Sequence, residues 1–186
     1  MSTFVINLKP IVAAIFAIVT YSLPLQAFAS DIGALLERLK TADSAEAAKI
    51  SREIQMDWSK SGSPTMDLLL KRARAALESE DFGAAIEHFT ALTDHAPEFA
   101  EGWHGRATAY FRVGKLGPAL ADLEKTLALN PHHYGAIYGL AVIFEQLKKY
   151  DEAYDAYSAV LAIHPHHEDV ATALERLEPL VNGVKL

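Results

Sequence analysis

Small and large apolar residues recur along the chain with a fixed period of 34 residues. The matched positions are Ala73, Ala107 and Ala141; Ala85, Ala119 and Ala153; Phe89, Leu123 and Tyr157; and Pro97, Pro131 and Pro165. Within each period, the apolar positions follow helical spacing in two stretches with a tight turn between them. A fixed period over three consecutive copies indicates an array of helix-turn-helix units, which we place at residues 66–99, 100–133 and 134–167.

The middle unit shows how the pattern predicts one helical pair. Trp103 and Ala107 share a face of the first helix, and Gly114 stands where a glycine commonly ends a helix. Pro118 falls in the first turn of the second helix, where its missing N–H costs no hydrogen bond. Alanine at 107 and at 119 allows the two helix backbones to approach each other closely, so we expect antiparallel packing.

The segments that flank the three units are also helical in pattern. Residues 30–65 contain two amphipathic stretches, and Asp43 with Glu46 forms a capping-box-like start for the second. We interpret this segment as a helical hairpin, a divergent unit that caps the array. Residues 168–186 contain one amphipathic helix and a tail, and we expect this helix to cover the apolar surface of the last unit.

Several positions of the middle unit resemble the signature of the tetratricopeptide repeat (TPR) family. They are Trp103, Ala107, Tyr110, Ala119, Leu123 and Pro131. The unit departs from the signature at Arg106, where the family favours leucine, and at Ala107, where glycine is common. The resemblance implies an all-α, right-handed superhelical TPR solenoid with three regular repeats, an N-terminal hairpin and a C-terminal capping helix. The stretch from Trp58 to Phe111 also resembles small exported TPR proteins of Gram-negative bacteria.

The first 29 residues have the pattern of a secretory signal peptide. Lys9 precedes an apolar run at 11–19, and a small-x-small triplet at 27–29 offers a cleavage site. A retained membrane anchor is the alternative, but the apolar run is shorter than the roughly 20 residues that a membrane-spanning helix needs. We therefore expect a periplasmic protein without stable membrane insertion after signal cleavage.

Composition excludes several classes of function. The chain has 17 lysines and arginines against 24 acidic residues, a formal net charge of −7, and it shows no basic stripe for nucleic acid. It has no cysteine, which excludes disulfides, thiolate metal sites and cysteine nucleophiles. Phosphate-binding glycine loops and Gly-x-Ser-x-Gly motifs are also missing from the sequence. We therefore expect a protein that is not an enzyme and uses no cofactor.

The histidines are the remaining candidate ligands, because six of the eight lie near repeat junctions. One interpretation is a surface metal or haem site that involves His164, His166 and His167. The interpretation we favour is that these are polar turn residues beside a helix-ending proline. We accordingly expect no metal site, with these three residues as weak candidates.

The TPR resemblance implies that the first helices of successive units line a concave groove. The residues expected there are Leu70, Arg74, Leu77, His104, Thr108, Phe111, Arg112, Tyr138 and Val142. Aromatic and aliphatic residues beside arginines can anchor an extended or helical peptide. The alternative for Leu70, Leu77 and Val142 is packing against the N-terminal hairpin or the C-terminal helix. Some family members hold a C-terminal carboxylate with lysines and asparagines in the groove, and this chain does not have that set.

These observations predict an exported scaffold that binds a peptide segment of an envelope or secreted partner in the groove. The alternative is a periplasmic protein that binds a metal ion or haem through the junction histidines. The sequence leaves self-association through the ends of the array open.

Overall fold

The computed structural model describes residues 32–181 and 183, and within them it shows nine α-helices and no β-strand. The helices are α2 (Ile32–Thr41), α3 (Ser44–Trp58), α4 (Pro64–Glu78), α5 (Phe82–His95), α6 (Ala100–Arg112), α7 (Leu116–Leu129), α8 (Tyr134–Gln146), α9 (Tyr150–Ile163) and α10 (Glu168–Val181). The predicted all-α class is confirmed. No helix in the described part of the chain has the length and apolar character needed to cross a membrane. The predicted signal peptide at 1–29 lies outside the described residues.

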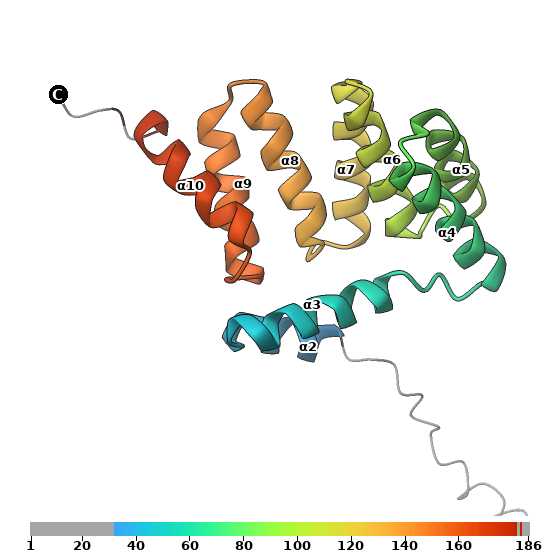
Figure 1. The fold of residues 1–186 in the computed structure, drawn as a ribbon, viewed down its shortest axis with the longest axis horizontal. Helices are drawn as coiled ribbons and strands as arrows, with labels where there is room; N and C mark the ends of the chain where they lie inside the picture. Colours follow the sequence, from blue (N-terminus) through green and yellow to red (C-terminus); the bar gives the residue numbers. More distant parts are fainter. Residues whose placement is uncertain (1–31, 182, 184–186) are drawn as a thin grey trace, which may run out of the picture. The chain divides into compact units, whose positions relative to one another are not determined.

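Six helices form three pairs, α4 with α5, α6 with α7, and α8 with α9, and the pairs follow one another in chain order (Figure 1). The first helix of each later pair also contacts the second helix of the pair before it, as α6 does with α5 and α8 with α7. The periodic alanines make this packing close: Ala73, Ala85, Ala119, Ala141 and Ala153 are fully buried. Helix α4 begins at Pro64, two residues before the predicted unit at 66–99.

The turn inside each pair contains one residue with a left-handed backbone. These residues are Glu80, Gly114 and Lys148, with φ angles of 61°, 74° and 60°. A side chain with a Cβ is disfavoured in this conformation, and glycine is not. All three turns therefore use the same geometry, but only the middle one has the residue that adopts it without strain.

Neighbouring pairs meet where a large side chain packs against a glycine. A Cβ atom built on Gly105 of α6 would lie 2.1 Å from Cε1 of Phe89, which is fully buried on α5. One repeat later, a Cβ atom on Gly139 of α8 would lie 3.2 Å from the Leu123 methyl groups on α7. Because glycine has no side chain, Phe89 and Leu123 can pack closely against the first helix of the next pair.

A buried ion pair reinforces the middle of the array. Arg106 of α6 donates from Nε to Asp122 of α7 at 2.7 Å and from a terminal nitrogen to the other carboxylate oxygen at 2.9 Å. Its remaining terminal nitrogen donates to Thr93 of α5 at 3.0 Å. The side chains of Arg106 and Asp122 are only 14% and 7% exposed. At the position where the family favours leucine, this chain therefore links three helices through one guanidinium.

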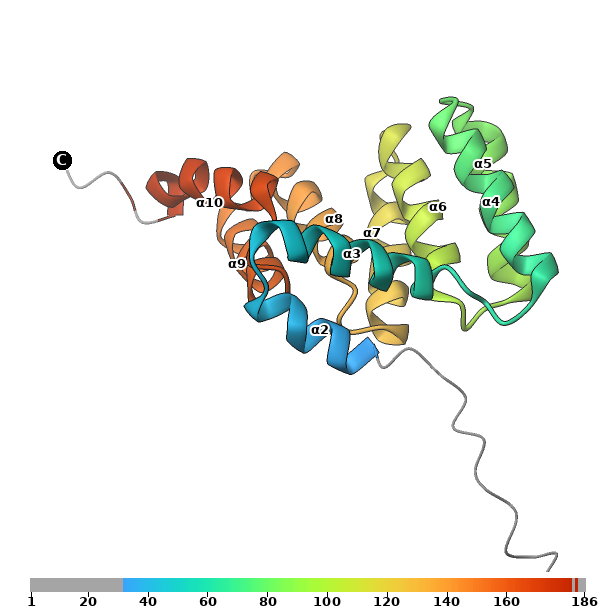
Figure 2. The same ribbon diagram turned by 60° about the horizontal axis from the view of Figure 1, so that its bottom comes forward.

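The N-terminal hairpin forms as predicted, but its position differs from the expected cap before the first unit. Asp43 accepts a hydrogen bond from the Glu46 N–H at 2.9 Å and so caps α3. The hairpin then runs along one edge of the array, past the ends of the later helices (Figures 1 and 2). Ser51 of α3 lies 2.8 Å from the Tyr134 hydroxyl of α8, and His166 donates to the Ala42 carbonyl at 2.9 Å.

The hairpin takes this position because its apolar face belongs to the core of the third pair. Its buried residues are Leu35, Leu36, Leu39, Ala47, Ile50 and Ile54, and they cluster with residues of α8, α9 and α10. At the far end of the described chain, α10 packs on α9 and buries Val170, Ala173 and Leu177. The third pair is thus covered from two sides.

Candidate functional site: two cavities along the first helices

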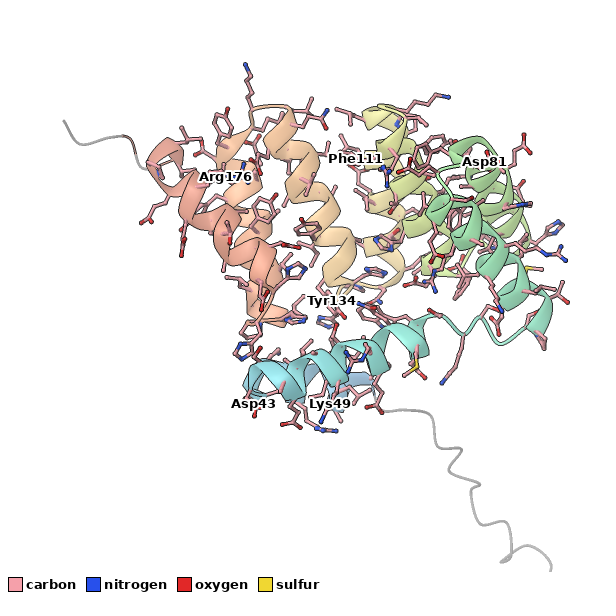
Figure 3. All side chains as sticks on the ribbon, viewed as in Figure 1. Asp43, Lys49, Asp81, Phe111, Tyr134 and Arg176 are labelled. Atoms are coloured by element: carbon pink, nitrogen blue, oxygen red, sulfur yellow. The ribbon has the colours of Figure 1, made fainter. Side chains whose placement is uncertain are left out.

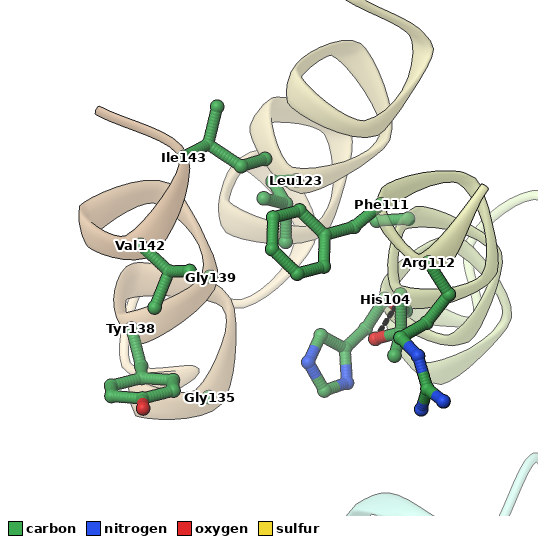
Figure 4. A pocket seen from close by; sticks show the side chains of 11 residues that line it. His104, Phe111, Arg112, Leu123, Gly135, Tyr138, Gly139, Val142 and Ile143 are labelled. Atoms are coloured by element: carbon green, nitrogen blue, oxygen red, sulfur yellow. Dashed lines mark hydrogen bonds between the residues drawn. The ribbon is translucent and has the colours of Figure 1, made fainter. Parts of the chain in front are cut away.

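Two neighbouring cavities lie along the first helices of the pairs, and together we call them the groove. The apolar cavity has a volume of about 270 Å³ and lies between α6 and α8 (Figure 4). The polar cavity has a volume of about 410 Å³ and is lined by residues of α3, α4, α6 and α8. His104, Thr108 and Gly135 line both, so the two cavities adjoin.

The apolar cavity is bounded by side chains of α6, α7 and α8. Phe111 of α6 and Tyr138 of α8 form opposite walls, and Leu123 lies at the base (Figure 4). Gly135 and Gly139 also line this space and project no side chain into it. The Tyr138 wall is held from behind, because its ring stacks on His167 with centroids 5.1 Å apart.

The structure brings together eight of the nine residues that the sequence places in the groove. Six line the apolar cavity, namely His104, Thr108, Phe111, Arg112, Tyr138 and Val142. Arg74 and Leu77 line the polar cavity. Leu70 is the exception and corrects the prediction: it is 2% exposed and packs with Ala73 and Phe89 in the core of the first pair.

The end of α3 closes one side of the polar cavity. The Trp58 ring stacks on His133 with centroids 4.7 Å apart and an interplanar angle of 21°. Arg74 of α4 donates to Ser59 Oγ at 2.8 Å and also forms an ion pair with Glu101 of α6. Figure 3 shows Tyr134 at the end of α8 that faces α3. The hairpin therefore contributes a wall of the groove.

Glu101, His104 and His133 form a cluster on the wall of the polar cavity, which we call the His–Glu cluster. Ligand atoms of all three lie within 4.8 Å of one another, and no other such metal-compatible group occurs in the described residues. His133 Nδ1 accepts from the Ala136 N–H at 3.0 Å and so caps α8. Its Nε2 consequently carries the proton and donates to Glu101 Oε1 at 2.9 Å.

The environment of the His–Glu cluster shifts two pKa values. Burial alone would raise the pKa of Glu101, but the hydrogen bond from His133 and the electrostatic effects of His104, His133 and Arg74 lower it to about 2. Burial, together with the neighbouring His133, lowers the pKa of His104 to about 4 against the opposing charge of Glu101. At neutral pH the cluster thus combines a carboxylate with an uncharged His104.

Of the three junction histidines that the sequence singles out, His164 and His167 meet edge to face with ring centroids 5.6 Å apart, but the three do not form a metal-compatible group. His166 is engaged with the Ala42 carbonyl, while His167 stacks on Tyr138. His164 is buried against Tyr134, and its Nδ1 has no hydrogen-bond partner. Among the residues the structure describes, the metal-compatible group involves a different junction histidine, His133.

Sequence reasoning missed Glu101 as a site residue because it is the second residue of a helix, where a solvated carboxylate is the usual occupant. It is buried because Arg74 and His133 pair with it from both sides. The proximity of Glu101 and His133 does not follow the 34-residue period, since they are separated by 32 residues. The one sequence feature that pointed to this site was the position of His133 at a repeat junction.

Comparisons with known proteins agree with this architecture. Two family models, both described as tetratricopeptide repeat, match residues 70–117 and 114–177, which together exceed half of the chain. A TPR repeat-containing protein of Rhizobium etli is 32% identical over 123 residues, which are 66% of this chain and 60% of that protein. Hsp70-Hsp90 organizing protein 1 of Glycine max is 23% identical over 147 residues, and the match spans only 25% of its length.

Solved structures show the same fold. The first TPR of Spaghetti (RPAP3), bound to the HSP90 peptide SRMEEVD, has a TM-score of 0.61 at 24% identity and covers 63% of this chain and 94% of that one. The crystal structure of MamA has a TM-score of 0.60 at 19% identity and covers 80% of this chain and 84% of that one. With three stacked helical pairs in the matched region, this chain belongs to the tetratricopeptide repeat family.

Proposed function

We propose that this protein is a scaffold that binds a peptide segment of a partner protein in the groove. The observation that carries the proposal is the apolar cavity, which is walled by Phe111 and Tyr138. Apolar and aromatic side chains in a preformed cavity are typical anchors for a peptide.

The size of the apolar cavity suits a peptide side chain. Its volume is about 270 Å³. A cavity of this size can hold one large apolar side chain, while the rest of the peptide lies along the groove.

The charges of the groove point to an apolar or mixed peptide. Arg74 is paired with Glu101, and Arg112 donates to Glu80 at 2.8 Å, so both arginines are already partly neutralised. No lysine or asparagine lines either cavity. Two structural neighbours have bound peptides that end in Glu-Glu-Val-Asp. The groove residues here give no comparable reason to expect an acidic C-terminal tail.

The proposal includes export and an envelope or secreted partner. It rests on the charged start, apolar run and small-residue triplet within residues 1–29. Cell fractionation with an antibody against the folded part tests it: we expect a shortened form in the periplasm. Retention of the uncut chain in the cytoplasm would contradict this part of the proposal.

Capture experiments test the groove itself. The purified protein is used as bait in a periplasmic extract, beside a Phe111→Ala/Tyr138→Ala variant, and the captured proteins are identified by mass spectrometry. The matched control is Val113→Ala/Leu147→Ala, which removes two apolar side chains that are 41% and 44% exposed in the turns. We expect the groove variant to lose partners that the control retains.

A filling variant separates lost contacts from lost folding. Thr108→Phe adds volume from α6 into the groove, and its melting temperature should stay near that of the wild type. The groove assignment fails if wild type, Phe111→Ala/Tyr138→Ala and Thr108→Phe all capture the same proteins.

A further inference from the structure

We propose that the His–Glu cluster of Glu101, His104 and His133 binds a divalent transition-metal ion, with Zn²⁺ as the best fit. Two imidazoles and one carboxylate are a ligand set that zinc accepts, with an open fourth position in sites of this type. The inference goes beyond peptide binding and does not depend on it.

The geometry of the cluster is close to what a zinc ion requires. Zinc lies about 2.0–2.2 Å from imidazole nitrogen and carboxylate oxygen, so two atoms bound to one ion are at most about 4.4 Å apart. The three ligand atoms here lie within 4.8 Å of one another, and His133 Nε2 is already 2.9 Å from Glu101 Oε1. A small movement of the half-buried His104 ring completes the set, because this ring borders both cavities.

A hydrogen bond joins His133 Nε2 and Glu101 Oε1 at the position proposed for the ion. His133 Nε2 donates its proton to Glu101 in a hydrogen bond, so an ion can bind Nε2 only in the other tautomer, with that proton moved to Nδ1. Nδ1 then no longer accepts from the Ala136 N–H, and the His133 ring must turn so that the two N–H donors separate. This N–H keeps a second acceptor, the backbone carbonyl of His133 at 2.9 Å, so α8 can remain formed.

The surroundings hold the ligands in place. Arg74 pairs with Glu101 Oε2, which leaves Oε1 directed at His133. Trp58 stacks on the His133 ring and fixes its plane. Groups that orient metal ligands in this way contribute to affinity. The positive charge of Arg74 works against a cation, whereas the negative charge of the Glu101 carboxylate favours one.

Calorimetric titration of the purified, untagged and chelator-treated protein with ZnCl₂ tests the inference. We expect one ion per chain with micromolar or tighter affinity. His104→Ala and Glu101→Gln should each weaken binding at least tenfold. His132→Ala is the matched control, since this exposed histidine lies next to the cluster in sequence but outside it.

Two further measurements separate the site from surface binding and from misfolding. The absorption spectrum of the Co²⁺ complex should report a low-coordinate site in the wild type and lose that signature in His104→Ala. Zinc should raise the melting temperature of the wild type but not of His104→Ala, whose fold is checked by circular dichroism. Absence of binding at neutral pH, or equal binding by His104→Ala and wild type, overturns the inference.

Discussion

The buried ion pair between Arg106 and Asp122 provides the sharpest test of how the array is held together. Replacing Asp122 by alanine removes the acceptor of two hydrogen bonds and leaves the guanidinium in a site where only 14% of the arginine side chain is exposed. Within the described part of the chain, Arg106 donates to no other carboxylate, so the variant leaves it only the hydroxyls of Thr90 and Thr93. Asp122→Ala therefore leaves the Arg106 guanidinium without a carboxylate hydrogen-bond partner between three helices.

The expected cost follows from the burial of the pair. Removing one partner of a buried ion pair costs about 3–5 kcal/mol. Arg106 retains some access to water and its bond to Thr93, so we expect Asp122→Ala to lose about 3 kcal/mol. For a chain of this size, that corresponds to a decrease in melting temperature of roughly 6–12 °C. The double variant Arg106→Leu/Asp122→Leu should fall within about 1 kcal/mol of the wild type, because apolar packing replaces the pair.

Urea unfolding followed by circular dichroism measures these free energies, and the two single leucine variants complete a double-mutant cycle. The control is Glu37→Ala, which breaks an exposed pair with Lys40 and should cost less than about 0.5 kcal/mol. The reasoning is refuted if Asp122→Ala costs under about 1 kcal/mol, or if the effects of the single leucine variants simply add in the double variant.

Three further predictions concern the turns, the joints between pairs and the His–Glu cluster. Lys148→Gly should stabilise the protein by about 1 kcal/mol, because glycine adopts the left-handed backbone at this position without strain. Gly114→Ala should destabilise it by a similar amount for the opposite reason. Urea unfolding measures both changes, and equal midpoints for the variants and the wild type would contradict the argument. Gly105→Ala should cost about 1–3 kcal/mol of stability, because the added Cβ meets the Phe89 ring. A second change, Phe89→Leu, should recover part of the loss. Thermal melts measure both effects, and an unchanged melting temperature in Gly105→Ala would contradict the close contact between Gly105 and Phe89. Stability should fall as pH drops from 6.5 to about 4, by up to about 1.4 kcal/mol per pH unit from His104, because the unfolded chain protonates His104 in that range and the folded chain does not. Glu101, whose folded pKa is about 2, extends the fall from 4.5 towards 2. His104→Ala should make the upper part of the fall shallower without removing it, because burial also lowers the pKa values of His164 and His167; an unchanged slope would contradict the argument.

The helical pairs were predictable because each helix packs mainly on its immediate neighbours, so a local pattern encodes the contact. Ala85 and Ala119 recur at the same register, and both are fully buried where two helices cross. The glycine joints at 105 and 139 follow the same period and could have been found by asking what faces Phe89 and Leu123. Periodicity therefore predicts most of the array.

The position of the hairpin was not predictable in this way, because its contacts reach far along the chain. Ser51 meets Tyr134 across a separation of 83 residues, and nothing in the repeat pattern relates these positions. The position of the hairpin also explains why the sequence did not predict the His–Glu cluster. Glu101 and His133 come together near Trp58 at an edge that the repeats alone would leave exposed.

The N-terminal hairpin of α2 and α3, which lies along one edge of the array, changes how the protein should fold. A stack of repeats behaves as a one-dimensional chain of near neighbours, in which each unit can gain or lose structure almost independently. Here the first helices of the described chain dock on the last pair, so a large loop must close before they gain their contacts. These long-range contacts raise the contact order, so we expect slower folding than in an array without them. We also expect fraying at either end to disrupt the other, so that the described helices unfold as one cooperative unit.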